Sequence, residues 1–405
     1  MTGQMIVKNN LRREKSREKT KIFRNFLTGV ANFLGDLGYT KIYKSFSKIS
    51  ESEIEWAASH LNYYYNYMIK YYAYDEILIF LLTKTTAILS LWGGYISAGG
   101  RSPPPFHNPP SFNTIYPLIT EETSPNPNTV IVIPTRLTSE EMHLSEDIKK
   151  NLLSPLSKLN LIKKILLVGD IDSRSERFLQ GIPKVSVIAV DKKEDSPAHS
   201  RNIGIKEALS LGADSVLFID DDVKILDANV INYLASKAHN IRGIVAPLVK
   251  GTRNTWFDIF HDYDGTLNGV YYRDGLLLYA TTCCTAISSE VLLDIQFDEN
   301  FKLAAGEDID FSIRALRKGF PIIPIDNIKI FHDYNYVRNP LEKFIRRYFR
   351  YGIGNYTLIS KHPYYYLLLS KCKERRTVEQ FKITNTTTVP PEIVDIKNKF
   401  KEVLR

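Results

Sequence analysis

The chain has 405 residues and carries 53 Lys and Arg against 45 Asp and Glu, a formal net charge of +8. Its hydrophobic fraction of 44% and charged fraction of 24% are those of a globular protein, and they exclude a collagen, a long coiled coil and a disordered chain. Three cysteines are too few for a disulfide framework or a four-cysteine zinc site, and no cleavable signal peptide is apparent. We therefore expect a cytoplasmic protein of two or three domains.

The positive charge is concentrated at the two ends of the chain. Residues 1–44 hold 10 Lys and Arg against 3 Asp and Glu, and residues 338–405 hold 15 against 6. The middle, residues 45–337, is acidic, with 28 Lys and Arg against 36 Asp and Glu. We therefore expect no nucleic-acid partner, since the basic charge avoids the middle of the chain. An acidic middle domain is suited to holding a metal cation.

The N-terminal region, residues 1–98, is predicted to be helical. Residues 1–20 are polar and charged and suggest a frayed arm, after which apolar side chains recur at helical spacing. The apolar run Ile77–Ile96 is 20 residues long, enough to cross a bilayer. Lys84 near its centre would cost about 2.5–3.5 kcal/mol on insertion, so we favour a buried or interfacial helix over a membrane span.

A proline-rich segment, residues 99–128, predicts a linker or wrapping segment and a domain boundary. From Thr129 onward, short apolar runs alternate with helical patterns. The strands are predicted at residues 130–133, 165–168, 185–190 and 216–219, and the helices at roughly 140–153 and 200–211. This alternation indicates an α/β domain over residues 129–335, with a mixed, mostly parallel sheet and helices on both faces. Ligands of such sheets bind beyond the carboxyl ends of the strands.

Polar side chains follow these predicted strands and form the candidate site. Three consecutive carboxylates, Asp220 to Asp222, repel one another, so a divalent cation that neutralises them is expected. A solvated Asp-rich turn is the alternative. Arg201 and Asn202 open a predicted helix whose N-terminus, with the Arg201 guanidinium, would bind a diphosphate. A surface salt bridge is the alternative for Arg201.

A second acidic motif, Gly306–Phe311, opens another predicted helix. Glu307 and Asp308 fall in its first turn, where the helix dipole favours carboxylates. This favourable interaction with the helix dipole would by itself explain why Glu307 lies at this position. For Asp308, a general base in a cleft is the sharper hypothesis.

The motifs along residues 129–335 carry a resemblance to a known family. They read VIVIPT, SPAHSRNIGIKEAL, ADSVLFIDDDV and TTCCTAISSEVLLDIQFDENFKLAAGEDIDFSIRALRKGF. Their order resembles that of GT-A glycosyltransferases, most nearly the inverting enzymes of family 2. The resemblance implies a GT-A, Rossmann-like fold. It also implies a metal-dependent transfer of a sugar, with inversion, from a nucleotide-diphosphate sugar of the UDP or GDP type.

Roles for individual residues follow from the resemblance where the motifs match. Asp220 and Asp222, with Asp221 between them, match the D-x-D motif that binds the nucleotide sugar and its Mg²⁺ or Mn²⁺. Asp308 matches the catalytic base and Glu307 its partner near the acceptor, and His332 resembles a third metal ligand of some relatives. The matches to the nucleotide-binding positions are Pro134, Thr135, Arg136, either Asp170 or Asp172, Arg201 and Asn202.

Residues 336–405 are predicted to form a basic, aromatic helical tail. In Leu341–Asn355 the apolar side chains lie on one face and the arginines largely off it. This pattern fits a helix on an anionic membrane surface, a lid over the active site, or a helix packed on the catalytic domain. The acceptor is left open between a glycan, a lipid-linked molecule and a small molecule. A nucleotidyltransferase and a non-catalytic GT-A binding or scaffold domain are the alternative functions.

Overall fold

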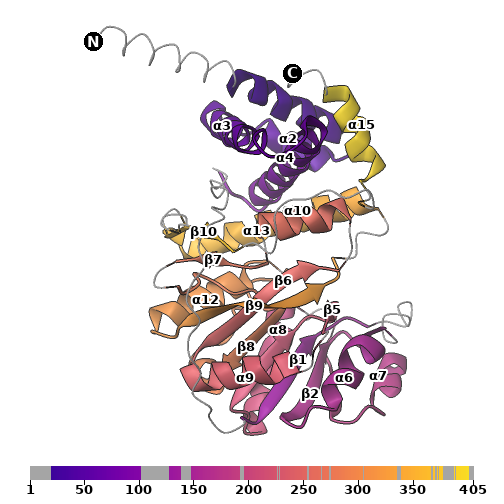
Figure 1. The fold of residues 1–405 in the computed structure, drawn as a ribbon, viewed down its shortest axis with the longest axis vertical. Coiled ribbons are helices and arrows are strands. Elements are labelled where there is room, and N and C mark those ends of the chain that lie inside the picture. The colour runs from indigo at the N-terminus through magenta and orange to yellow at the C-terminus, as the bar shows by residue number, and fades with distance from the viewer. Residues whose placement is uncertain are drawn as a thin grey trace.

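The computed structural model describes residues 20–101, 127–137, 147–191, 196–334 and 339–400, with short gaps at 226, 228, 253–254, 266, 273–274, 304, 366–367, 370–371, 373, 377–386 and 388. The predicted N-terminal arm up to residue 19, most of the proline-rich segment and the first part of the predicted helix 140–153 lie outside the described residues. Figure 1 shows a helical layer at one end, the helices α10 and α13 below it, and a sheet with its own helices at the other end.

The helical layer is built from N-terminal residues and one C-terminal helix. Residues 20–36 are helical, and they are followed by α2 (Thr40–Phe46), α3 (Glu51–Met68) and α4 (Tyr74–Ser97), on which α15 (Pro391–Phe400) packs. Helix α3 begins at a capping box, because the Ser50 hydroxyl accepts from the Glu53 N–H and the Glu53 carboxylate accepts from the Ser50 N–H.

Helix α4 is the apolar run for which a buried helix and a membrane span were both considered. By length and composition it could cross a membrane, and its most apolar window is entirely buried within the protein. Lys84 is only 3% exposed, and its ammonium lies 2.5 Å from a carboxylate oxygen of Asp264. A buried charge is costly without a partner, so this ion pair explains how α4 keeps a lysine inside the structure.

The sheet has eight strands in the order β3-β2-β1-β4-β8-β6-β9-β5. Strands β3, β2, β1 and β4 are parallel, as are β6 and β9, whereas β8 runs antiparallel to both of its neighbours and β5 antiparallel to β9. The predicted α/β class and mixed, mostly parallel sheet are therefore confirmed. The strand bounds are Thr129–Pro134 (β1), Ile162–Gly169 (β2), Val185–Ala189 (β3), Ser215–Ile219 (β4), Val223–Lys224 (β5), Ile244–Gly251 (β6), Cys284–Ser288 (β8) and Ile322–His332 (β9).

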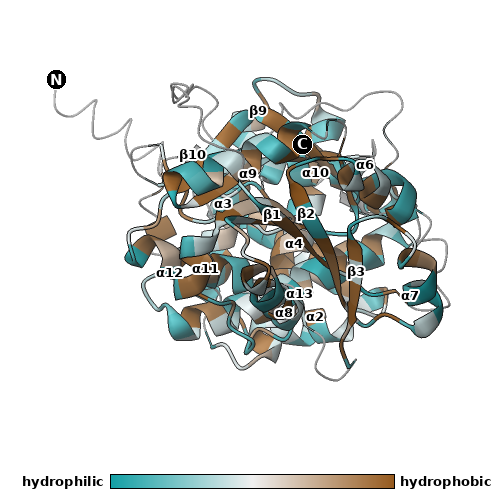
Figure 2. Cartoon of the chain, turned by 90° about the horizontal axis from the view of Figure 1, so that it is seen from below, coloured by the Kyte–Doolittle hydropathy of each residue, from teal (hydrophilic) through white to brown (hydrophobic). Residues whose placement is uncertain are grey.

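Helices cover both faces of the sheet, as predicted, because the strands are apolar on both sides. Ile131 and Ile133 of β1 face one core, and Val130 and Val132 face the other. The first core is closed by η2 (Lys149–Leu153), α6 (Ser154–Ser157), α7 (Ser173–Leu179) and α9 (Asn229–Ile241). The second is closed by α8 (Pro197–Ser210), α11 (Ser289–Asp294) and α12 (Glu307–Arg317). Figure 2 shows the apolar strands β1, β2 and β3 in brown between helices with teal outer faces.

Helix α13 (Pro340–Lys361) joins the helical layer to the rest of the protein. Its apolar face packs against α4 and against α10 (Trp256–Asp264), where the rings of Phe344 and Phe257 stack at 4.3 Å. A Cβ added to Gly352 would lie 2.0 Å from the Leu91 carbonyl oxygen, and one added to Gly94 would lie 1.9 Å from the Phe349 carbonyl oxygen. Helices α4 and α13 therefore touch backbone to backbone. A small strand pair, β7 (Val270–Tyr271) with β10 (Glu374–Arg375), ties the tail to the sheet domain.

This contact predicts that Gly352→Ala destabilises the protein, although alanine is the better helix former by about 1 kcal/mol. Overpacking of a tight contact typically costs about 1–3 kcal/mol, and here the obstacle is a carbonyl that cannot rotate away. The midpoint of thermal unfolding should fall. Gly181→Ala is the control, because nothing lies within 4 Å of its added Cβ and its midpoint should be unchanged or slightly higher. Equal stability of the Gly352 variant and the wild type would contradict the contact.

Candidate active site

Three side chains that can bind a metal ion come together at one edge of the sheet. Asp220 follows β4, Asp222 precedes β5, and His332 ends β9. Their ligand atoms all lie within 4.8 Å of one another, and His332 Nε2 is 3.2 Å from Asp222 Oδ1. The antiparallel pairing of β5 with β9 produces this arrangement, since Val223 lies opposite His332 in the register. The structure therefore brings together the three predicted metal ligands.

The electrostatics of this cluster fit a divalent cation. Burial and the Asp220 carboxylate raise the pKa of Asp222 to about 8, and burial and Asp222 raise that of Asp221 to about 7. Burial and the positive charge of Arg347 lower the pKa of His332 to about 4, so its imidazole is neutral and able to bind a metal. Asp222 Oδ1 is buried and accepts no hydrogen bond from the described residues. Two carboxylates and one imidazole suit Mg²⁺ or, with the nitrogen ligand, a transition metal such as Mn²⁺.

The residues predicted to bind the nucleoside lie at the ends of the parallel strands. The Thr135 hydroxyl donates to Asp221 Oδ2, which links the end of β1 to the acidic triplet. Arg136 Nε lies 3.3 Å from Asp170 Oδ2, and the Leu137 N–H donates to the Asp170 carbonyl at 2.9 Å. With Pro134, the last residue of β1, these residues share one edge of the sheet. Their contact with a nucleotide stays a prediction.

Two other residues from the predicted nucleotide site have their polar groups engaged in the fold. Asp172 caps α7, accepting from the N–H groups of Arg174 and Ser175 at 3.1 and 2.8 Å. The Asn202 amide exchanges two hydrogen bonds of 2.9 Å with the backbone of Phe297. Between Asp170 and Asp172, which the sequence leaves open, Asp170 is the one that faces Arg136. A role in nucleotide binding stays a prediction for Asp172 and Asn202.

Arg201 forms a buried bridge between the metal-ligand cluster and α12. It is 4% exposed, and its guanidinium donates to Glu307 Oε1 at 2.8 Å and to Asp220 Oδ1 at 3.4 Å. Burial alone would lower the pKa of Arg201, but the two carboxylates outweigh it and raise the pKa. The ion pair that the sequence admitted as an alternative is therefore present, in a buried rather than a surface position.

Asp308 lies in the first turn of α12, directly after Glu307. The helix is preceded by Gly306, which has a φ of 89°, a backbone angle that glycine adopts without strain. Burial and the Glu307 carboxylate raise the pKa of Asp308 to about 7, against the opposing charge of Arg201. Asp308 therefore can exchange a proton near neutral pH. Asp310, two residues further along, is completely buried, pairs with Arg314 and Lys361, and lies 2.8 Å from His362 Nε2, which leaves it no such role.

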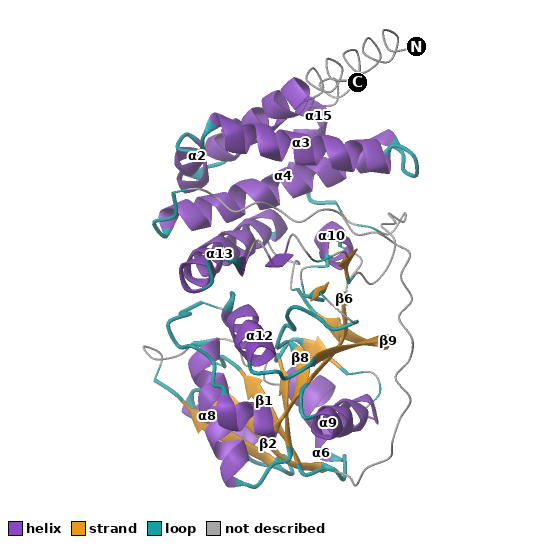
Figure 3. Ribbon diagram, turned by 90° about the vertical axis from the view of Figure 1, so that its left-hand side faces the viewer, coloured by secondary structure: helices purple, strands orange, loops and turns teal. Residues whose placement is uncertain are grey.

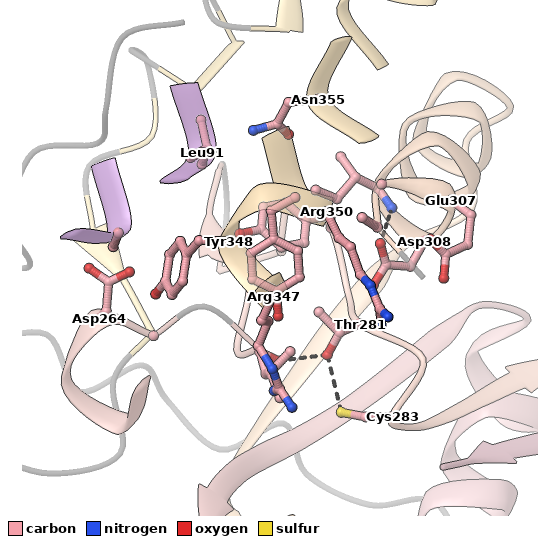
Figure 4. Close-up of a pocket in the computed structure, with 18 of the residues that line it drawn as sticks. Leu91, Asp264, Thr281, Cys283, Glu307, Asp308, Arg347, Tyr348, Arg350 and Asn355 are labelled. Atoms are coloured by element: carbon pink, nitrogen blue, oxygen red, sulfur yellow. Dashed lines mark hydrogen bonds between the residues drawn. The ribbon is translucent and has the colours of Figure 1, made fainter. Parts of the chain in front are cut away.

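A cavity of about 620 Å³ joins Asp308 and Glu307 to the metal-ligand cluster and Arg201. Figure 4 shows Arg347 and Arg350 of α13 among the side chains that line this cavity, together with Glu307 and Asp308. Helix α4 also contributes to the lining, through Lys84, Ala87, Ile88 and Leu91. The aromatic and basic pattern of Leu341–Asn355 suggested a lid, but nothing in the apolar run of α4 pointed to the site.

Of the roles predicted for the tail helix, packing on the sheet domain is present, since Gly354 of α13 lies against Ala305, and α13 also lines the cavity. Its association with an anionic membrane stays a prediction. Both Cys283 and Cys284 are buried. Burial raises the pKa of each thiol, most strongly for Cys283 at the cavity wall, so neither is an activated nucleophile.

No protein-family model and no curated protein matches this sequence. Among solved structures, it is similar to mannosyltransferase PcManGT of Pyrobaculum calidifontis in complex with GDP-Man and Mn²⁺, at 12% identity over 73% of this chain and 84% of that chain, with a TM-score of 0.39. It is also similar to residues 1–349 of S. aureus TarS, at 18% identity over 55% of this chain and 65% of that one, with a TM-score of 0.38.

A third similar structure is glucosyl-3-phosphoglycerate synthase of Mycobacterium tuberculosis with Mn²⁺, UDP and glucosyl-3-phosphoglycerate. The identity is 16% over 58% of this chain and 80% of that chain, with a TM-score of 0.37. The similar solved structures thus include glycosyltransferases. Likeness of this extent carries no argument about activity, which rests on the geometry of the cavity.

The buried bridge predicts that Arg201→Met is strongly destabilising. Removing one partner of a buried ion pair leaves the other charge without compensation, typically at about 3–5 kcal/mol. The midpoint of thermal unfolding should therefore fall by several degrees. Arg136→Met is the matched control, since that side chain is 57% exposed and its pair with Asp170 is worth no more than about 1 kcal/mol. If both variants unfold at the same temperature, Arg201 is not the bridge that we describe.

Proposed function

We propose that this protein is a metal-dependent glycosyltransferase that moves a sugar from a nucleotide-diphosphate sugar to an acceptor hydroxyl. The observation that carries the proposal is that one cavity is lined both by a cluster of metal-binding side chains and by a carboxyl group that titrates near pH 7. The metal-binding side chains are Asp220, Asp222 and His332, and the carboxyl group is that of Asp308. A bound metal ion suits a charged leaving group, and the carboxyl group suits removal of a proton from an acceptor.

The donor is held at the sheet edge. A divalent cation bound by Asp220, Asp222 and His332 would neutralise the charge that develops on the leaving diphosphate. Arg347 adds a fixed positive charge on the same side, since it lowers the pKa of Asp222. Thr135 and its neighbours at the strand ends, with Asp170 as acceptor for an N–H of the base, hold the nucleoside.

The acceptor is deprotonated by Asp308. As the acceptor oxygen attacks the anomeric carbon, its proton passes to a carboxylate oxygen of Asp308, and the diphosphate leaves from the opposite face of the sugar with inversion. The ion pair between Glu307 and Arg201 fixes the first turn of α12 and so the place of Asp308. Glu307 also raises the pKa of Asp308, which brings the base close to the working pH.

The two alternative functions are less well supported. A nucleotidyltransferase of this fold usually carries a glycine-rich loop with a basic residue after the first strand. Here β1 is followed by Thr135 and Arg136, and Arg136 pairs with Asp170. A non-catalytic scaffold would not need to keep the metal-ligand cluster and Asp308 on one cavity.

The proposal predicts that donor binding needs a divalent cation. UDP and GDP, titrated by calorimetry, should bind in Mn²⁺ or Mg²⁺ and lose most of their affinity in EDTA. Asp222→Ala should have the same effect, because it removes a ligand of the cation. Glu207→Ala, an exposed carboxylate on α8, should bind as the wild type does. Equal affinities with and without the cation would refute the metal site. A screen of nucleotide sugars for hydrolysis would then identify the donor.

Asp308→Asn tests the base. Loss of a general base typically costs about 10²–10⁴ in rate, while the affinity for the nucleotide should persist. The wild-type rate should fall below about pH 7, since only the ionised Asp308 accepts a proton. Asp294→Asn, which changes an exposed carboxylate, is the control. If Asp308→Asn transfers sugar at more than about a tenth of the wild-type rate, Asp308 is not the catalytic base.

The same variant separates catalysis from helix capping by its stability. The pKa of Asp308 rises on folding from 3.8 to about 7. The unfolded chain therefore releases this proton first as the pH rises, and stability is lost between these values. At pH 8 the neutral asparagine should make the protein as stable as the wild type or more so. A role in capping alone predicts the opposite, a loss of about 0.3–1 kcal/mol with transfer retained.

A further inference from the structure

A series of rings in contact leads from the metal-ligand cluster to the helices above the sheet. The ring centre of Tyr334 lies 4.8 Å from that of His332 and 4.6 Å from that of His261 on α10. His261 in turn stacks at 5.7 Å on Tyr348 of α13. Figure 3 shows α10 and α13 between α4 and the strands β6 and β9. Tyr334 thus contacts both a predicted metal ligand and a helix that packs on the sheet.

The sheet holds the backbone of His332 but not its imidazole. His332 lies opposite Val223 of β5 and opposite Gly251 of β6, and its carbonyl accepts from the Thr252 N–H at 3.1 Å. This pairing on both sides fixes the position of the Cα atom. The imidazole can still turn about its two side-chain bonds, χ1 and χ2. A side-chain contact must therefore set the direction of Nε2.

A hydrogen bond does not supply this contact. A histidine that binds a metal usually donates from its other ring nitrogen to a carboxylate or a carbonyl, which fixes the ring. Nδ1 of His332 is buried and has no hydrogen-bond partner among the described residues. Nε2 lies 3.2 Å from Asp222 Oδ1, but both atoms belong to the cluster that would hold the cation. The orientation of the imidazole then depends on the rings packed against it.

The ring of Tyr334 is itself firmly enclosed. Tyr334 is 3% exposed, and the Arg347 guanidinium lies 5.1 Å from the centre of its ring. Gly251 leaves room for the ring, since an added Cβ would lie 3.2 Å from Tyr334 Cε2. An aromatic ring with so little freedom can restrict the imidazole next to it.

We infer that Tyr334 is a positioning residue of the metal site, and that its ring holds the imidazole of His332 with Nε2 beside Asp222. Contacts between aromatic rings favour particular orientations. An imidazole that is already oriented loses less freedom when a cation binds, so the affinity for the cation is higher. The inference rests on the proposed function, because it concerns the metal site on which that function depends.

Packing of the core is the simpler role for Tyr334. The residue belongs to the hydrophobic cluster that α4, α10 and α13 share. If packing were its whole role, replacing it would lower stability and leave the metal affinity of the folded protein unchanged. A positioning role acts through His332, so its effect on metal affinity must disappear when the imidazole is absent. A double-mutant cycle therefore separates the two roles.

The experiment titrates Mn²⁺ into the full chain by calorimetry, alone and with whichever of UDP and GDP binds. Tyr334→Leu should weaken Mn²⁺ about tenfold, the lower end of the effect of losing an outer partner of a metal ligand. Tyr334→Phe should bind nearly as the wild type does, because the ring remains. In His332→Ala, which should itself bind Mn²⁺ more weakly, adding Tyr334→Leu should change the affinity less than about twofold.

A matched control and a second variant guard against effects of stability. Tyr64→Leu removes another buried tyrosine, on α3 and outside the cavity lining, and should leave Mn²⁺ affinity unchanged. Thermal unfolding shows which variants are folded at the temperature of the titration. If Tyr334→Leu is not folded, Tyr334→Met, which keeps more of the side-chain length without a ring, gives the same test. Three results would each overturn the inference: unchanged affinity without the ring, equal loss in Tyr334→Phe, or equal loss with and without His332.

The outcomes also distinguish this inference from the proposed function. If the wild type binds Mn²⁺ neither alone nor with UDP or GDP, the metal site fails and the inference fails with it. If His332→Ala binds Mn²⁺ as tightly as the wild type, the inference is overturned, while a site formed by Asp220 and Asp222 stands. If His332→Ala weakens Mn²⁺ and Tyr334→Leu does not, the metal site stands and only the positioning role is wrong.

Discussion

Four carboxylates meet in one partly buried space, and their mutual repulsion is the constraint around which the site is arranged. Asp220, Asp222, Glu307 and Asp308 all line the same cavity. Arg201 offsets part of this repulsion by bridging Asp220 to Glu307, and the positive charge of Arg347 opposes the rise in the pKa of Asp222. The raised pKa values of Asp222 and Asp308 show that these two cations do not neutralise the cluster completely. The remaining excess of negative charge is what a divalent cation would offset.

This balance divides the carboxylates into separate roles. Asp220 and Asp222 stand beside His332 and can share a cation. Glu307 is held by Arg201, so it fixes the start of α12. Asp308 is left with a carboxyl group that titrates near neutrality, which is the property required of a general base. Four carboxylates therefore differ in their partners and their pKa values because different charged groups surround them.

The helical layer is the second feature on which the cavity depends. Helix α13 lies between α4 and the sheet domain, and two glycine contacts bring it backbone to backbone with α4. A third, at Gly354, places α13 directly against the Ala305 carbonyl, beside the loop that leads into α12. Close backbone contacts therefore connect α4, through α13, to the loop that precedes Asp308. N-terminal, central and C-terminal segments of the chain thus enclose one cavity.

The sequence by itself located the residues of the first four strands, whereas their order in the sheet comes from the structure. Apolar runs at 130–133, 165–168, 185–190 and 216–219 all lie in strands or at their ends, because a strand buried on both faces must be apolar throughout. The acidic triplet was predicted as a site because adjacent carboxylates repel one another unless a cation neutralises them. Glu307 and Asp308 were predicted as site residues from their place at the start of a helix and from the resemblance of their motif. The antiparallel strand β8 and the full length of β9 were not predicted, since their pairing depends on partners distant in the chain.

Only the tertiary structure decided what each polar residue of the candidate site contacts. Asp170 and Asp172 are equivalent in the sequence, yet one faces Arg136 and the other caps α7. Asn202 and Arg201 are neighbours on α8, yet the first is bonded to the backbone of Phe297 and the second bridges two carboxylates. The contribution of α4 was equally hidden, because an apolar helix has the same sequence pattern whether it lines a cavity, fills a core or crosses a membrane. Local patterns fix which side chains are buried, whereas long-range packing fixes what each of them meets there.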